Sequence, residues 1–159
     1  MTESNTYYHY FFKFAFLGFG VVLLSIPVIA FISPDFVTTT SNGVTEHTDP
    51  SWTIIFGLIG ILFILIFLAI KDKFAIVELG NQTVKIKQGG QERIVNWLQI
   101  EQLKQIQFVS PPLYKLKTKD SDQVVWFNTQ PSYISVGGYT TDLSEMGDLI
   151  KKKKRELGL

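Results

Sequence analysis

The sequence contains no cysteine, and only two of its 159 residues are histidine. Without cysteine the chain has no disulfide, no thiolate metal site and no cysteine nucleophile. It also lacks the HExxH and GxSxG motifs and the phosphate-binding loop, so metalloprotease, hydrolase and nucleotide-binding chemistry have no residues to carry them. We therefore expect a protein that is not an enzyme, with no catalytic residues, no cofactor and no metal site.

Two long apolar runs, residues 11–32 and 53–70, dominate the first part of the chain. As helices they would be roughly 33 Å and 27 Å long, close to the hydrocarbon thickness of about 30 Å. We expect a transmembrane hairpin over residues 1–70, with an external loop at 33–52. The first run is expected to be a retained span rather than a cleaved signal peptide, because no lysine or arginine lies in residues 1–10.

The loop at 33–52 has no lysine or arginine, whereas Lys71 and Lys73 directly follow the second run. This charge bias places the loop outside and both termini in the cytoplasm. Within the loop, residues 36–40 and 44–48 flank Asn42-Gly43 and predict a small β-hairpin. Aromatic residues at the ends of the runs are expected to anchor the hairpin at the membrane interfaces: Tyr7, Tyr8, Tyr10 and Trp52.

Four glycines in the two runs are candidate helix-packing residues, because a missing side chain lets two helix backbones approach closely. They are Gly18, Gly20, Gly57 and Gly60. Two alternatives remain open at this point. The hairpin packs on itself, or these glycines contact the helices of a partner protein.

From Lys71 onward, short β-prone runs alternate with turn residues and predict an antiparallel β-structure. The expected strands are 74–79, 83–88, 92–95, one through 97–108, then 113–118, 123–129 and 133–136. Asp142 and Glu145 have the spacing of a capping box, and apolar residues at helical spacing predict a final amphipathic helix: Leu143, Met146, Leu149, Ile150 and Leu157. The expected fold class is an α+β membrane protein, with one small antiparallel β domain at 71–159 that ends in this helix.

The order of these parts resembles the bacterial membrane-anchored pleckstrin-homology-like (PH-like) proteins. The resemblance lies in the helical hairpin, the segments IVNWLQIEQLKQIQF and YKLKTKDSDQVVWF, and the amphipathic tail. It implies a PH-like domain, a multi-pass location in the bacterial inner (cytoplasmic) membrane, and a scaffold or accessory role without assigned catalytic residues.

The strongest charge block is a candidate lipid-surface site formed by Lys151, Lys152, Lys153, Lys154 and Arg155. Near an anionic leaflet each cation contributes about 1 kcal/mol of attraction. Cations in the last turns of a helix are also favoured by the helix dipole without any partner. A second set, Lys85, Lys87 and Arg93, is the nearest counterpart of a headgroup-binding cluster. Alternation with Val84 and Ile86 marks the two lysines as the solvent face of a half-buried strand, and Glu92 lies beside Arg93.

These features favour a non-catalytic accessory or scaffold subunit of an inner-membrane protein complex. The alternatives are an autonomous module that binds anionic lipid surfaces and a small membrane immunity or regulatory protein. The expected partners are membrane lipid and an integral membrane protein. No small-molecule substrate is indicated, and without a basic stripe no nucleic acid is expected.

Overall fold

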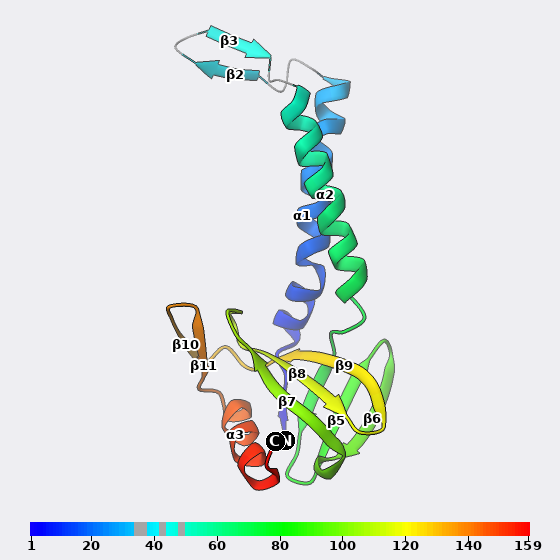
Figure 1. The fold of residues 1–159 in the computed structure, drawn as a ribbon, viewed down its shortest axis with the longest axis vertical. Helices are drawn as coiled ribbons and strands as arrows, with labels where there is room; N and C mark the ends of the chain where they lie inside the picture. Colours follow the sequence, from blue (N-terminus) through cyan, green and yellow to red (C-terminus); the bar gives the residue numbers. More distant parts are fainter. Residues whose placement is uncertain (34–37, 42–43, 48–49) are drawn as a thin grey trace. The chain divides into compact units, whose positions relative to one another are not determined.

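The computed structural model describes residues 1–33, 38–41, 44–47 and 50–159. The chain forms two compact units. Met1–Phe12 and Asp72–Leu159 make one unit, called here the β-domain, and Lys13–Lys71 make the other, the helical hairpin. The sequence analysis placed residues 1–12 with the hairpin. In the structure they belong to the β-domain, because they add a strand to its first sheet (Figure 1).

The helical hairpin contains α1 (Thr6–Ile32), which begins in the β-domain, and α2 (Pro50–Ile70). Both helices are long and apolar enough to cross a membrane. They are joined through β2 (Thr38–Ser41) and β3 (Val44–His47), an antiparallel pair as predicted. The predicted Asn42-Gly43 turn lies outside the described residues.

The β-domain is built from two antiparallel sheets. The first has the order β1-β4-β5-β6 and contains β1 (Thr2–Glu3), β4 (Ile76–Leu79), β5 (Thr83–Gln88) and β6 (Gln91–Asn96). The second has the order β7-β8-β9 and contains β7 (Ile100–Ile106), β8 (Leu113–Thr118) and β9 (Ser121–Asn128). A short 3-10 helix, η2 (Trp97–Gln99), connects them, and a parallel bridge between Phe74 and Trp126 joins their other edges.

The core lies between the two sheets, where alternate residues of each strand point inward. The fully buried side chains include Val84 and Ile86 from the first sheet and Leu116 and Phe127 from the second. The Trp97 indole fills one end of the core and donates a hydrogen bond to the Gly80 carbonyl at 2.8 Å. Burial of each large apolar side chain stabilises the fold by about 1.5–3 kcal/mol.

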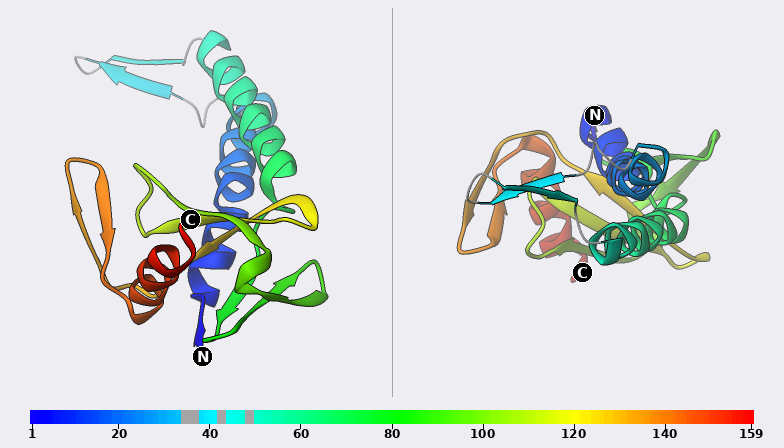
Figure 2. Two further views of the ribbon diagram at one scale, coloured as in Figure 1. Left: turned by 60° about the horizontal axis from the view of Figure 1, so that its bottom comes forward. Right: turned by 90° about the horizontal axis from the view of Figure 1, so that it is seen from above.

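The chain ends with β10 (Tyr133–Val136), β11 (Tyr139–Asp142) and α3 (Glu145–Leu157). The helix packs through Met146 and Ile150, as its spacing predicted, and the predicted bounds of β5, β8 and β10 are confirmed. Figure 2 shows β10–β11 and β5–β6 projecting on opposite sides of the β-domain.

Several local predictions were wrong. β1 and β11 were not predicted, and the single strand expected over 97–108 is η2 followed by β7, because Asn96 caps a helical turn. The N-cap of α3 is Ser144 rather than Asp142, since the Ser144 hydroxyl accepts the Gly147 N–H at 3.0 Å. Leu143 precedes the helix and is 48% exposed.

Candidate functional surfaces

Within the helical hairpin, α1 and α2 approach each other closely at two of the predicted packing glycines. A Cβ placed on Gly20 would lie 2.7 Å from Ile64 Cγ1 and 3.0 Å from the Gly60 carbonyl oxygen. A Cβ on Gly60 would lie 2.9 Å from Leu24 Cγ and 3.0 Å from the Gly20 carbonyl oxygen. Neither position has room for a side chain, so these glycines allow the two backbones to pack together.

The other two glycines differ from each other. A Cβ on Gly57 would contact Pro27 Cγ at 3.3 Å, which places Gly57 on the same helix–helix contact. A Cβ on Gly18 would meet nothing within 4 Å. Three of the four candidates therefore serve packing within the hairpin, the first of the two alternatives, and Gly18 lies on an open face of α1.

The predicted lipid-surface residues of α3 surround the last turns of the helix. The Lys151 ammonium donates to the Asp142 carbonyl at 2.6 Å and to Asp148 at 3.1 Å. The Lys153 ammonium pairs with Glu156 at 2.8 Å and lowers the pKa of that carboxyl. In the described part of the chain three cations make no ion pair, although the Lys152 charge also lowers the Glu156 pKa. They are Lys152, Lys154 and Arg155. An open groove of about 510 Å³ is lined by Lys151, Lys154, Arg155 and Leu159.

The residues Lys152, Lys154 and Arg155, called here the basic turn, lie in the last turns of α3, away from the start of that helix. The start is fixed next to β8, because Asp142 accepts a hydrogen bond from the Tyr114 hydroxyl at 3.0 Å. α3 then runs for 13 residues, about 20 Å, along β1 (Figure 1). The basic turn and the residues around Tyr114 therefore lie at opposite ends of α3.

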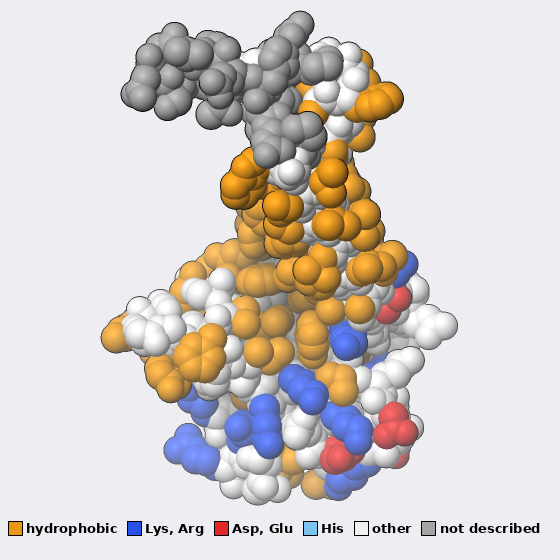
Figure 3. All heavy atoms as spheres, turned by 45° about the horizontal axis from the view of Figure 1, so that its top comes forward, with side chains coloured by type: hydrophobic (Ala, Val, Ile, Leu, Met, Phe, Trp, Pro, Cys, Tyr) orange, Lys and Arg blue, Asp and Glu red, His pale blue; other side chains and the backbone are white. Residues whose placement is uncertain are grey.

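The second sheet and the β10–β11 hairpin expose a group of large apolar side chains that the sequence analysis did not single out. This group, called here the apolar rim, consists of Phe108, Ile134, Val136 and Tyr139, which are 56–72% exposed. Figure 3 shows hydrophobic side chains gathered over the β10–β11 hairpin. The Phe108 and Tyr139 rings are in contact, with centroids 5.1 Å apart, and Phe108 has a backbone φ of 62°. A positive φ at a bulky residue is rare, so the surrounding structure fixes this loop.

The opposite face of the β10–β11 hairpin is polar and points into the β-domain. Thr140 is 5% exposed. Its hydroxyl donates to the Val109 carbonyl at 3.0 Å, and its backbone carbonyl accepts from the Gln105 side-chain amide at 2.6 Å. Asp142 is 1% exposed and accepts from Tyr114. Burial, followed by the Asp142 charge, raises the pKa of Tyr114 well above its usual value.

The cluster compared above with a headgroup site is largely neutralised. Lys85 pairs with Glu92 at 2.9 Å, and Lys87 pairs with Glu78, which lies opposite Lys85 on β4. The hydrogen bond from Lys87 lowers the Glu78 pKa. These pairs agree with the interpretation of both lysines as the solvent face of β5.

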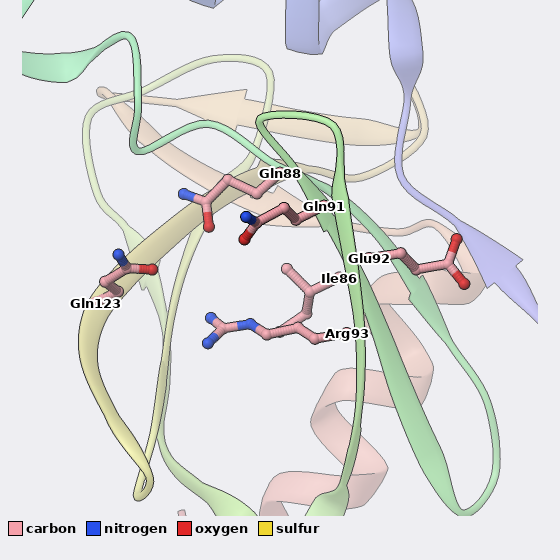
Figure 4. A pocket seen from close by; sticks show the side chains of 6 residues that line it. All are labelled: Ile86, Gln88, Gln91, Glu92, Arg93 and Gln123. Carbon is pink, nitrogen blue, oxygen red and sulfur yellow. The ribbon is translucent and has the colours of Figure 1, made fainter.

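Arg93 is placed differently, at a small opening between β5–β6 and β9. The cavity has a volume of about 120 Å³ and is lined by Ile86, Gln88, Gln91, Glu92, Arg93 and Gln123. Figure 4 shows the Arg93 guanidinium pointing into this space and the Glu92 carboxylate pointing away from it. Arg93 Nη2 is buried without a hydrogen-bond partner in the described part of the chain. The opening thus offers hydrogen-bond donors to a water molecule or a small anion.

Comparison with protein-family models, with curated proteins and with solved structures found no match for this chain.

Proposed function

We propose that this chain is a membrane-anchored, non-catalytic accessory or scaffold subunit, in which α1 and α2 span the bacterial inner membrane and a PH-like β-domain faces the cytoplasm. One observation carries the proposal: the residues before α1 and after α2 build a single sheet. Thr2 pairs with Leu79, and Glu3 pairs with Glu78. The Ser4 N–H also donates to the Val77 carbonyl, and the Val77 N–H donates to the Ser4 hydroxyl, both at 2.8 Å.

This pairing limits the topology. Strands β1 and β4 can pair only if both lie on the same face of the membrane, so a chain crossing at α1 has to return at α2. The lysines that follow α2 favour the cytoplasm for that face. A folded domain held at both ends of a membrane hairpin suits an adaptor that presents a surface close to the bilayer.

Two features offer contacts to a partner. Gly18 lies on an open face of α1, where a helix of another membrane protein can approach closely. The basic turn of α3 presents Lys152, Lys154 and Arg155, which make no ion pair among the described residues, and this suits an acidic protein surface.

Purification of the tagged full-length chain from its native membranes in mild detergent tests the proposal. We expect a stoichiometric partner, and we expect Gly18→Leu to release it, because leucine would hold the helices apart. Val28→Leu is the matched control, since Val28 is an exposed α1 residue that already carries a side chain. Failure to recover any stoichiometric partner would contradict the accessory role. If the Gly18→Leu variant still co-purified with the partner, the β-domain rather than α1 would provide the attachment.

A second candidate, binding of an anionic lipid surface by the basic turn, is favoured by the open groove lined by Lys151, Lys154 and Arg155. In the test, added anionic vesicles supply such a surface. Proteoliposomes should then cluster added anionic vesicles at low salt, and replacing Lys151–Lys154 by Gln should abolish clustering. Unchanged clustering by that variant would exclude this role.

A further inference from the structure

We propose that the apolar rim inserts into the interfacial region of the lipid bilayer that anchors this chain, so that the β-domain contacts the membrane through its own surface. The rim consists of Phe108, Ile134, Val136 and Tyr139. The inference rests on the proposal that α1 and α2 span a bilayer, and its experiment separates the two.

The first argument is the inverted orientation of the β10–β11 hairpin. In a sheet with one face in water, the apolar side chains normally point to the core. Here Ile134 and Val136 are 56% and 72% exposed, while Thr140 and Asp142 are buried. Hydrogen bonds from Thr140 to Val109 and from Tyr114 to Asp142 hold this orientation, so the outward apolar face is a fixed part of the fold.

The second argument is the position of the rim within the β-domain. Strand register places Ile106, Leu113 and Asn128 side by side, so the loop that carries Phe108 lies at this end of the second sheet. The Asn5 N–H donates to the Asn128 carbonyl at 3.1 Å at the same end, and α1 begins at the next residue. Within the β-domain unit, Figure 1 shows the β7–β8 loop and the β10–β11 hairpin extending in the direction in which residues 6–12, the first turns of α1, run. The apolar run at 11–32 starts directly after the first turn of α1.

The third argument is the chemistry around the rim. Tyrosine is preferred at membrane interfaces, and phenylalanine is common on the apolar face of segments that lie in the interface. The first turns of α1 add further exposed aromatic side chains: Tyr7, Tyr10 and Phe11. On the outer face of the second sheet, Lys104 lies opposite Lys115, which lies opposite Trp126. The Lys73 ammonium stacks over Trp126 at 5.2 Å. Lys73, Lys104 and Lys115 make no ion pair among the described residues, so they are available to lipid phosphates.

The absence of cysteine makes the test direct, because each introduced cysteine is the only one in the chain. Spin labels are placed at Val136→Cys in the rim, at Leu98→Cys as a control and at Leu62→Cys in α2. Leu98 is 67% exposed, similar to Val136, but lies in η2 at the other end of the sheets, where the Gln99 carbonyl accepts from Lys119. The full-length protein is reconstituted in nanodiscs that contain anionic lipid. Collision rates are measured with oxygen, which concentrates in lipid, and with a water-soluble nickel chelate.

We expect the label at Val136 to show a several-fold higher ratio of oxygen to nickel collisions than the label at Leu98, and the label at Leu62 to show the highest ratio. Equal ratios at Val136 and Leu98 with a high ratio at Leu62 would overturn the rim inference and leave the membrane hairpin standing. A low ratio at Leu62 would overturn the membrane hairpin itself. Spin–spin broadening at Val136 between copies would assign the rim to a second copy of the chain and overturn lipid contact. Labels at Ile134 and Tyr139 repeat the measurement, so that the result does not depend on one substitution.

Discussion

The β5–β6 and β10–β11 hairpins close with the same turn, but the first buries its apolar face and the second buries its polar face. Each turn is a Gly-Gly pair in the left-handed region, with φ values of 58° and 81° at Gly89 and Gly90 and 59° and 83° at Gly137 and Gly138. In β5, Val84 and Ile86 are fully buried, and the lysine that follows each of them forms an ion pair at the surface. In β10–β11 the apolar residues face outward.

This difference shows that turn chemistry and alternation specify a hairpin without specifying which face is buried. A Gly-Gly turn fixes the register of two strands, and the alternation sorts their side chains into two faces. The choice of face depends on what the rest of the fold offers. β5–β6 meets an apolar sheet, whereas β10–β11 meets the polar groups of Gln105, Val109 and Tyr114.

The largest expected contrast comes from the same substitution in both hairpins. Ile86→Ala removes a fully buried side chain and should lower the free energy of unfolding by about 2–5 kcal/mol. Ile134→Ala removes an exposed side chain and should change it by less than about 0.5 kcal/mol in detergent. Urea unfolding of the full-length protein, followed by tryptophan fluorescence, measures both. Equal losses would mean that Ile134 is buried against the protein, which would end the distinction between the two hairpins.

The extent to which the sequence predicted the fold follows from the same physics. The apolar helices and strands β5, β8 and β10 were predictable because their signals are local: hydrophobic length, period-two alternation and glycine turns. β1 was not, because its two residues become a strand only by pairing with β4, more than 70 positions away. The bridge between Phe74 and the half-buried Trp126 was not predictable either, because this contact depends on how the sheets meet.

The candidate surfaces divide in a similar way. Gly20, Gly57 and Gly60 were predictable as packing residues because glycine in an apolar helix has few other uses, but only three-dimensional packing separates them from Gly18. The apolar rim was missed because Ile134 and Val136 have the same alternation as a buried strand. The one local sign was Asp142. It shares a face of β11 with Thr140, and a charged residue would ordinarily place that face in solvent, whereas here the face is buried.

The next contrast concerns the polar face of β10–β11. Asp142→Ala would leave the Tyr114 hydroxyl and the Ser144 N–H without their acceptor and should lower the free energy of unfolding by about 1–3 kcal/mol. Asp122→Ala is the control, because the Asp122 carboxylate is exposed and at the edge of an ion pair. The same unfolding assay applies. If Asp142→Ala lowered the free energy of unfolding no more than the control does, the hydrogen bonds of Asp142 would not be what keeps the polar face of β10–β11 buried.

The pH dependence of stability tests the same contact from the Tyr114 side. Burial raises the pKa of Tyr114 above the ordinary tyrosine value of about 10, so the folded protein keeps the hydroxyl protonated at a pH where the unfolded chain ionises it. The stabilisation is complete below about pH 10 and should fall by up to about 1.4 kcal/mol for each pH unit above it. Tyr114→Phe should lack this part of the decline. Parallel stability curves for the two proteins between pH 9 and 11 would show that Tyr114 ionises equally in both states.

The smallest contrast compares the second glycines of the two turns. Gly90→Ala and Gly138→Ala both place a side chain at a φ just above 80°, which costs roughly 1–2 kcal/mol at either position. A Cβ at Gly90 meets nothing within 4 Å, whereas a Cβ at Gly138 lies 3.0 Å from Phe108 Cδ1. Gly138→Ala should therefore cost slightly more and should displace the Phe108 ring from Tyr139. Chemical shifts of the Tyr139 ring detect that displacement, and Gly90→Ala should leave them unchanged. Unchanged Tyr139 shifts in both variants would mean that the Phe108–Tyr139 contact tolerates the added methyl group, and that the rim is less tightly built than the β5–β6 core.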